Sequence, residues 1–312
     1  MLHPTRASWL LSAAASFGVF AVRGAANAQT GAPINVGAGL IESHAEGYYA
    51  QEMGFFKQRG LTVQLHTLRN GAAIAAAVTG GDLQIGCSTV LQLAQAHARG
   101  LPYVIIAPGG IHDGRFVHTA SIVVAADSPV TNAKELTGKV IAASTLNGLD
   151  QLATSALIDR SGGDSSVTKF VEIPPSAMVE ALAQGRVAAA SMEEPELSAA
   201  GSRIRRIGDG LDAIAKIFVT TSWFTTTDWL AKNKDTARRF TDATFAAGSW
   251  AMANPDKAAT VLTKYLNFKE PRSIQPFATK RDFGAMTALL TTAAKYKFIA
   301  PVNPSEFVWD GK

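Results

Sequence analysis

Apolar and polar positions follow two different periods along most of this chain, and together they predict an α/β fold. Short apolar or β-branched runs, such as Ile34–Ala38 and residues 121–126, are typical of strands. Helical stretches that end at glycine lie between such runs. Residues 48–61 predict an amphipathic helix, a glycine stop and re-entry into a strand. A strand–helix–strand unit of this kind predicts an open sheet with a ligand crevice at the carboxyl ends of its strands.

The alternation of strand and helix occurs in two blocks, which predicts two lobes. Strands are expected at 34–38, 61–65, 83–86, 101–107, 121–126, 139–143, 168–172, 187–190 and 216–221. Helices are expected at 71–78, 89–99, 148–160, 176–184, 235–254, 255–265 and 280–296. We therefore expect residues 29–125 and 221–312 to form lobe 1 and residues 126–220 to form lobe 2, with a ligand cleft between the lobes.

The first 28 residues are typical of an export signal. His3 and Arg6 form a weakly basic start, residues 9–22 are apolar, and an Ala-x-Ala cleavage box at 26–28 predicts cleavage after Ala28. The apolar stretch is too short to span a bilayer, so an uncleaved membrane anchor is the less favoured alternative. The mature protein is therefore expected in the periplasm.

Charge and cysteine content narrow the classes of function. The formal net charge is only +4 and the basic residues are scattered, apart from a short cluster at 203–206, so we expect no nucleic-acid partner. Cys87 is the only cysteine, which means that packing rather than an internal disulfide must hold the fold. His112 and His118 have no second cluster of ligand residues nearby, so we expect no metal site.

The order and spacing of several motifs resemble a bacterial family of ABC-transporter substrate-binding proteins. The motifs lie at 48–61, 70–72, 79–86, 98–102, 133–142, 173–178, 181–185 and 193–195. The family comprises the receptors for nitrate, sulfonates, taurine and thiamine-pyrimidine precursors. The resemblance extends from about residue 34 to residue 253. It implies a two-lobed type II periplasmic-binding-protein fold that closes on a small molecule and docks on a membrane permease.

One motif departs from the pattern of this family. The family often has an aromatic residue directly before Glu-Pro in the second lobe, whereas this chain has Glu193 before Glu194. Two adjacent carboxylates would repel a sulfonate or nitrate, and would suit an amine, an amidine-like ring edge or a hydroxyl donor. We expect one of the two to reach the cleft; the alternative is that one faces solvent and the other caps the helix after Pro195.

Turns from strand to helix supply most candidate ligand contacts, because the free N–H groups of a helix N-terminus offer donors and partial positive charge. Plain N-capping is the alternative at each turn, and capping and ligand contact can coexist. The candidates at these turns are Glu42, Ser43, His44, Asn70, Gly71, Ser88, Thr89, Thr145 and Asn147. Arg115 is a candidate clamp for a carboxylate, with a solvated turn as the alternative. Tyr48 and Tyr49 could stack on a ligand ring, although helical spacing places at least one in the core.

The sequence thus predicts a periplasmic receptor of an ABC importer that captures a small organic solute by lobe closure. The solute classes considered are a sulfonate, an aromatic carboxylate and a pyrimidine-like compound. The expected partners are this ligand and an ABC permease with its cytoplasmic ATPase; we expect a monomer, no cofactor and hinges near 121–126 and 216–221. One alternative is an exported enzyme of the same fold with Cys87 as nucleophile, although a small buried thiol is the more usual role. Another is an extracytoplasmic ligand-sensing module.

Overall fold

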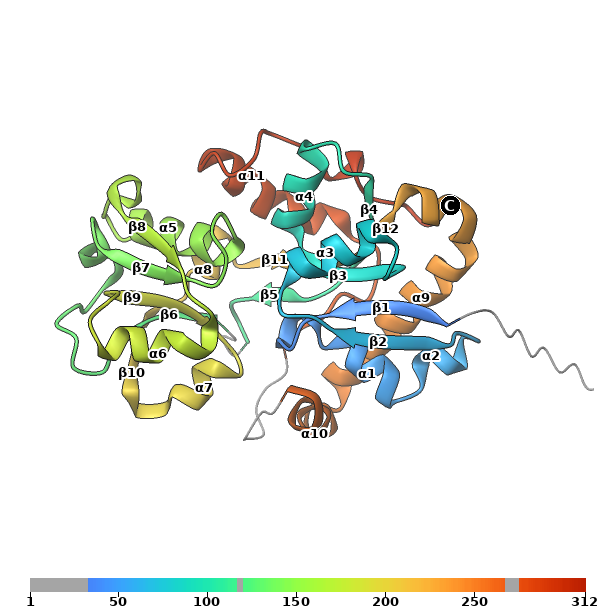
Figure 1. The fold of residues 1–312 in the computed structure, drawn as a ribbon, viewed down its shortest axis with the longest axis horizontal. Coiled ribbons are helices and arrows are strands. Elements are labelled where there is room, and N and C mark those ends of the chain that lie inside the picture. The colour runs from blue at the N-terminus through green and yellow to red at the C-terminus, as the bar shows by residue number, and fades with distance from the viewer. Residues whose placement is uncertain (1–32, 117–119, 267–274) are drawn as a thin grey trace, which may run out of the picture. The chain divides into compact units, whose positions relative to one another are not determined.

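Strands of the computed structural model, which describes residues 33–116, 120–266 and 275–312, form two five-stranded sheets and a two-stranded sheet. The strands are β1 (Ile34–Ala38), β2 (Val63–Thr67), β3 (Ile85–Thr89), β4 (Tyr103–Pro108), β5 (Ile111–Asp113), β6 (Ala120–Ala125), β7 (Val140–Ala143), β8 (Lys169–Glu172), β9 (Ala189–Glu193), β10 (Ile204–Gly208), β11 (Ile217–Val219) and β12 (Thr221–Thr226). The first sheet has the order β2-β1-β3-β12-β4 and the second the order β10-β6-β9-β7-β8 (Figure 1). The prediction of an α/β fold is therefore confirmed.

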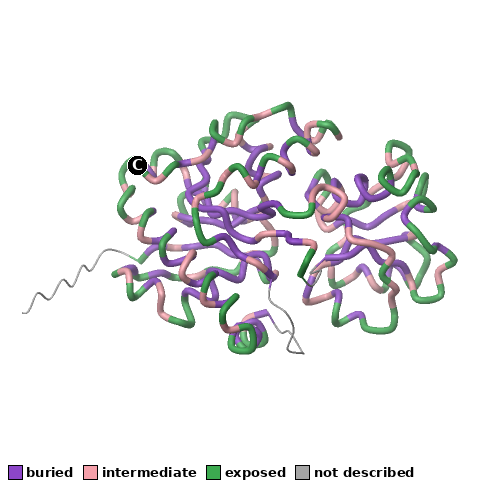
Figure 2. Tube along the Cα trace, turned by 180° about the vertical axis from the view of Figure 1, so that it is seen from behind, coloured by how far each residue is buried: buried purple, intermediate pink, exposed green. Residues whose placement is uncertain are grey.

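Helices cover both faces of each five-stranded sheet. They are α1 (Glu46–Glu52), α2 (Phe55–Gln58), α3 (Gly71–Gly80), α4 (Val90–Ala98), α5 (Leu149–Arg160), α6 (Pro175–Ala183), α7 (Glu196–Ala200), α8 (Leu211–Ile214), α9 (Thr227–Ala253), α10 (Pro255–Leu266) and α11 (Thr287–Lys295). Short 3-10 helices are η1 (Glu42–His44), η2 (Ala133–Leu136), η3 (Ser165–Val167), η4 (Gly201–Arg203), η5 (Phe283–Met286) and η6 (Pro304–Glu306). The sheets are the buried layers in Figure 2. Their inner parallel strands, such as β7, are largely apolar because both faces are covered, whereas the edge strands β2 and β8 contain polar, exposed residues.

The second sheet with α5, α6, α7 and α8 is called the second lobe below, and the remaining described elements around the first sheet are the first lobe. The chain crosses between the lobes through β5 and β11, which pair antiparallel with each other. The first crossing therefore lies upstream of the predicted hinge at 121–126. Residues 121–125 belong to β6, which pairs with β9 and β10 in the second sheet, whereas the sequence assigned them to lobe 1.

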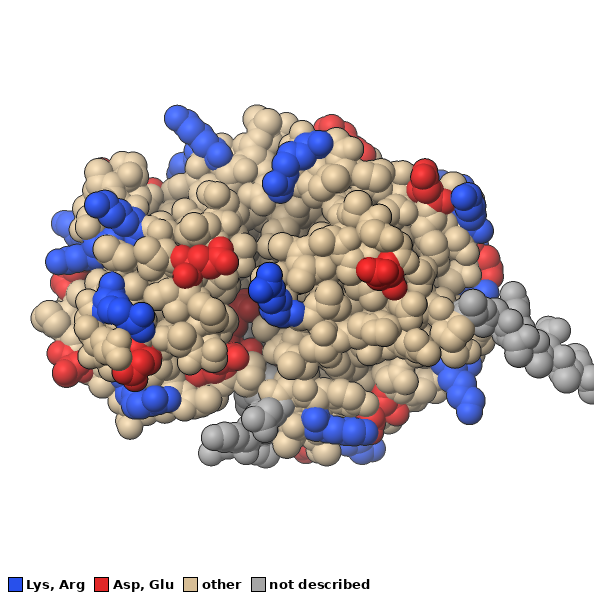
Figure 3. Space-filling model, in the orientation of Figure 1, with Lys and Arg blue, Asp and Glu red and all other residues tan. Residues whose placement is uncertain are grey.

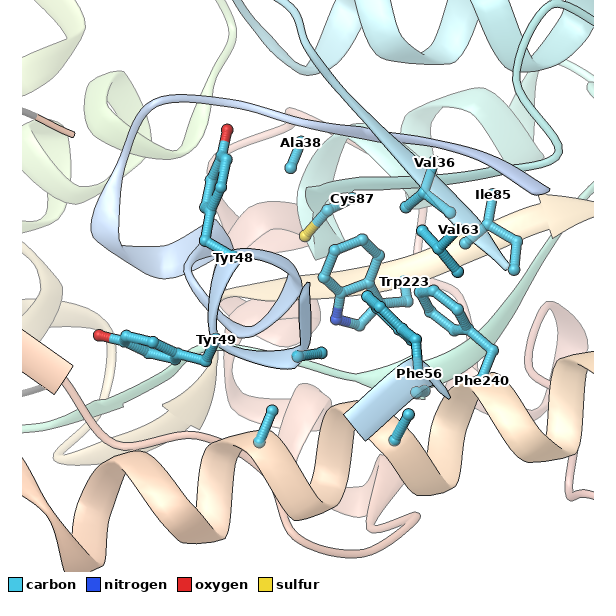
Figure 4. Close-up of a cluster of buried hydrophobic side chains, with 14 of the residues drawn as sticks. Val36, Ala38, Tyr48, Tyr49, Phe56, Val63, Ile85, Cys87, Trp223 and Phe240 are labelled. Atoms are coloured by element: carbon cyan, nitrogen blue, oxygen red, sulfur yellow. The ribbon is translucent and has the colours of Figure 1, made fainter. Parts of the chain in front are cut away.

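Aromatic side chains fill the core between the first sheet and helices α1, α2 and α9 (Figure 4). Trp223 of β12 is fully buried, and its ring lies 5.2 Å from that of Phe240, which stacks at 5.3 Å on Phe56. Tyr48 and Tyr49 are also buried in this core, so neither ring is presented to a ligand. This packing fixes the carboxyl ends of β1, β2 and β3, from which the first-lobe wall of the site is built.

Three strands were not expected from the sequence: β5, which was read as a polar loop, β10 and β12. β12 lies antiparallel between β3 and β4, although the strand expected at 216–221 was not predicted to continue beyond residue 221. β10 coincides with the basic cluster at 203–206, where arginines interrupt the apolar alternation. Among the described residues, no helix combines the length and the apolar character that crossing a membrane requires.

Candidate functional site

A cavity of about 390 Å³ takes its walls from both lobes. The first-lobe wall comes from the loops after β1, β2 and β3, and the second-lobe wall from β9 and the loops after β7 and β8. β5 and the turn between β11 and β12 also contribute. Ligands of open α/β sheets bind at these carboxyl ends, and the volume lies within the range of small-molecule sites. The cavity is therefore the candidate binding site.

The helix starts at Asn70 and Thr89 line the cavity and are capped at the same time. Asn70 Oδ1 accepts from Ala73 N at 2.9 Å, and Thr89 Oγ1 accepts from Gln92 N at 3.2 Å. Gly71 follows directly, and a Cβ at that position would collide with Gln92 and with Ser88 Oγ. The caps thus hold the N-termini of α3 and α4 at the cavity wall, and the missing side chain of Gly71 lets the two N-termini approach each other closely.

His44 presents a hydrogen-bond donor to the cavity. The residue is only 2 % exposed, and its Nδ1 accepts from Gly39 N at 2.8 Å. Burial lowers the pKa of His44 to about 4, so the ring is neutral at physiological pH. Because Nδ1 accepts, the remaining proton sits on Nε2, which makes no hydrogen bond to any residue that the structure describes.

The second-lobe wall is acidic. Asp150, Glu172, Glu193 and Glu196 all line the cavity. Burial, together with the nearby carboxyls of Asp150, Glu196 and Glu42, raises the pKa of Glu193 to about 7. Burial also raises the pKa values of Asp150 and Glu196. Asp150 accepts hydrogen bonds from the backbone and hydroxyl of Ser144, whereas the Glu193 carboxyl has no hydrogen-bond partner in the described part of the chain.

Several residues of the site were missed by the sequence analysis. Arg69, Asp150, Ser191 and Glu196 line the cavity but were not among the candidates. Ser191 shares a face of β9 with Glu193, since side chains two residues apart in a strand point the same way. Arg69 directly precedes the Asn70 cap, and that position was the available signal for it.

The predicted residues that line the cavity are Ser43, His44, Asn70, Gly71, Thr89, Thr145 and Glu193. Glu42, Ser88, Arg115, Asn147 and Glu194 do not line it. Glu42 Oε1 accepts from Gln275 N at 2.8 Å in the protein interior, and Ser88 Oγ donates to Gln92 Oε1 at 2.9 Å. Asn147 is exposed, and its carbonyl accepts from Gln95 Nε2 of α4 at 3.0 Å.

Arg115 and Glu194 are occupied by partners of their own. Arg115 Nη2 donates to Asp113 Oδ2 at 2.6 Å. The carboxylate that this arginine binds is therefore that of Asp113 at the end of β5, and not that of a ligand. Asp113 accordingly has a lowered pKa, because the Arg115 guanidinium bonds to it. Glu194 accepts from Ser198 N at 3.0 Å and caps α7, which is the alternative considered for one member of the glutamate pair.

The carboxyl of Glu46 and the thiol of Cys87 lie in the core rather than in the cavity. Glu46 Oε2 accepts from Trp223 Nε1 at 2.7 Å, and burial raises the Glu46 pKa well above its usual range. Cys87 is fully buried near Trp223 (Figure 4). Burial, with the Glu46 carboxyl nearby, raises the pKa of the Cys87 thiol well above its usual value. A nucleophilic thiolate at the site is therefore disfavoured.

No group of three or more His, Cys, Asp or Glu side chains suited to a metal ion is present among the described residues. His118, considered with His112 above, lies outside that part of the chain. His112 Nε2 instead lies 2.9 Å from Asp212 Oδ1, which connects β5 to α8 across the lobe crossing.

Two lobes with sheets of mixed strand direction, and a cavity lined from both, define the periplasmic-binding-protein fold. The family model described as NMT1/THI5 like matches residues 41–258, more than half of the chain, and the chain belongs to this family. A comparison with curated protein sequences found no match. The resemblance stated from the sequence is thus confirmed at the level of family and fold.

Solved structures with the same fold differ in function. The periplasmic aliphatic sulphonate binding protein SsuA of Escherichia coli has 17% identity and a TM-score of 0.68, over 89% of this chain and 92% of that chain. The periplasmic nitrate-binding protein NrtA of Synechocystis PCC 6803 has 13% identity and a TM-score of 0.68, over 89% and 86%. The desulfurization enzyme DszB has 14% identity and a TM-score of 0.64, over 88% and 96%. At such identities the likeness shows the fold alone, and the site must decide the function.

Proposed function

We propose that this chain is the substrate-binding receptor of an ABC importer and captures a small organic solute that carries a cationic or hydrogen-bond-donating group. The observation that carries the proposal is the acidic second-lobe wall of the cavity. Glu193 faces this space without a hydrogen-bond partner among the described residues, beside Asp150 and Glu196. Carboxyl groups in this position accept from amines, amidine-like ring edges and hydroxyls, and repel an anion that has no donor.

The proposed solute is accordingly narrower than the set considered from the sequence. A pyrimidine-like compound with an exocyclic amino group offers a donor to the Glu193 carboxyl, which has no hydrogen-bond partner among the described residues. A simple sulfonate or aromatic carboxylate would bring a like charge to this wall and would also have to be desolvated there. The first-lobe donors, such as His44 Nε2, can bind a ring nitrogen or a carbonyl of the same solute.

Capture would proceed by movement of the lobes about the paired crossings β5 and β11. These short strands are the links between the two larger sheets, and their pairing keeps the links together during a hinge motion. In this proposal, closure places groups of both walls on one solute, and the closed receptor, a monomer exported to the periplasm, docks on a permease with its ATPase.

Thermal shift and isothermal titration with amines, aminopyrimidines, sulfonates and aromatic carboxylates test the proposal. A bound solute at a hundredfold excess over its Kd should stabilise the native state by about 2.7 kcal/mol. We expect this response from donor-bearing compounds. Binding confined to sulfonates or carboxylates that lack a donor group would contradict the proposed solute class.

The enzyme alternative makes a different prediction for Cys87→Ala. Because the thiol is buried in the core and outside the cavity, this variant should bind the same compounds within about twofold and lose about 1 kcal/mol of unfolding free energy. Titration measures the affinity of the variant, and chromatography of the products shows whether a bound compound is turned over. Turnover of a bound compound by the native protein, abolished in Cys87→Ala, would favour an enzyme.

A further inference from the structure

We infer that the cavity has two half-sites of opposite charge and takes a dipolar solute, with a cationic group held by the second lobe and an anionic group held by the first. The inference rests on the proposed function and names the substrate class of the same site. The acidic half-site consists of Asp150, Ser191, Glu193 and Glu196, and the basic half-site of Arg69, the start of α3 and His44.

The acidic half-site contains a largely buried serine whose hydroxyl is available to a ligand. Ser191 is only 8 % exposed and lines the cavity, yet its Oγ makes no hydrogen bond with any described residue. It lies two positions before Glu193 on β9, so both side chains share the face directed at the cavity. The hydroxyl of a serine that is buried to this extent normally has a hydrogen-bond partner. A cationic ligand group can donate to Ser191 Oγ and Glu193 together.

The basic half-site combines a guanidinium with a helix N-terminus. Arg69 lies between β2 and α3, and within the described chain it forms no ion pair. The next residue, Asn70, caps Ala73 N, which leaves the earlier N–H groups at the start of α3 for an external acceptor. His44 Nε2–H adds a neutral donor to the same wall. Together these groups suit a carboxylate or a sulfonate.

No ion pair joins the acidic half-site to the basic half-site. Arg69, which is solvent-exposed, forms no ion pair with Glu193 or Asp150, although all three residues line one cavity. Figure 3 shows the groove between the lobes with acidic atoms gathered along its second-lobe side and a basic side chain on the facing rim. Opposite charges that face one space without meeting are best satisfied by a molecule that carries both charges at its two ends.

The test uses matched organic probes and isothermal titration of the full chain. The zwitterions γ-aminobutyrate, δ-aminovalerate and ε-aminocaproate are compared with the alkylamine and the alkanoate of the same length. The corresponding amino sulfonates tell which anionic group is preferred. At least one zwitterion should bind about tenfold more tightly than either half-molecule, since each half-site supplies a charge-assisted hydrogen bond.

Variants assign the two ends. In Arg69→Gln the ratio of zwitterion affinity to amine affinity should fall to about one, and in Glu193→Gln the ratio of zwitterion affinity to alkanoate affinity should do the same. Arg186→Gln, an exposed arginine outside the cavity, serves as the control and should change neither ratio. Folding of each variant is checked by its unfolding temperature without ligand.

Failure of the inference can be told apart from failure of the proposed function. An amine or aminopyrimidine that binds as tightly as every zwitterion overturns the dipolar assignment and leaves the receptor proposal intact. Failure of all zwitterions likewise overturns the inference. If no organic compound binds and none is released from the purified protein, both proposals fall.

Discussion

An amine that binds the cavity is expected to bind about tenfold more tightly at pH 8 than at pH 6, because the Glu193 carboxyl titrates within this range. Below its pKa of about 7 this group is neutral and offers a cation little attraction. Burial also raises the pKa values of the neighbouring Asp150 and Glu196 carboxyls. His44 has a pKa of about 4 and stays neutral throughout, so it adds no opposing trend.

Titration calorimetry in two buffers with different ionisation enthalpies measures this linkage. At pH 6 amine binding should release protons, since the bound cation favours the ionised form of Glu193. In Glu193→Gln the pH dependence should largely disappear, while Glu180→Gln, an exposed glutamate of α6, should behave as the native protein does. A pH profile that is the same in Glu193→Gln and in the native protein would show that another group is responsible.

The same carboxyl should weaken the unliganded protein as the pH rises. A carboxyl whose pKa is raised on folding stabilises the native state below its unfolded pKa, and that contribution is lost as the pH rises to about 7. At pH 8, therefore, Glu193→Gln should melt at a higher temperature than the native protein while binding amines less tightly. A gain in stability together with a loss of affinity is typical of substitutions at residues that serve binding.

Phe240→Ala is expected to lower the free energy of unfolding by about 3–5 kcal/mol. The ring is fully buried between Phe56 and Trp223, with centroid distances of 5.3 and 5.2 Å, and no neighbouring side chain could fill the space without leaving its own position. Urea denaturation followed by circular dichroism measures the loss.

Phe245→Ala on the same helix is the matched control. Phe245 is half-buried and lies under Arg281, whose guanidinium carbon is 5.9 Å from the ring centroid. Its removal should cost clearly less, because solvent can occupy part of the space. Equal losses in the two variants, or a loss below about 1 kcal/mol for Phe240→Ala, would contradict the described core.

The elements of the fold follow from the sequence wherever local signals agree with packing. Asn70 and Thr89 precede helical runs as capping residues, and both helices begin where these caps predict. β12 was missed although Trp223, Phe224 and the threonines around them are residue types enriched in strands; its place between β3 and β4 follows only from pairing. Long-range pairing of this kind leaves no periodic signal in a stretch of six residues.

The site is less predictable because side-chain direction decides it. The pair Glu193 and Glu194 was recognised as a candidate. Which of the two faces the cavity depends on the alternation of side chains along β9, and this strand extends to Glu193 rather than ending at residue 190. Arg115 has a long side chain that could have reached the cleft, and Asp113 in its own loop binds it instead. The role of Arg69 required knowing that the loops after β2 and β9 line the same cavity.

Mass spectrometry of the small molecules released from freshly purified, full-length protein, followed by titration of the identified compound into stripped protein, tests the central claim most directly. We predict one organic solute per chain that carries a cationic or donor group, and whose affinity falls at least tenfold in Glu193→Gln. Release and rebinding of an anion without any donor group, with equal affinity in the native protein and in Glu193→Gln, would contradict the account.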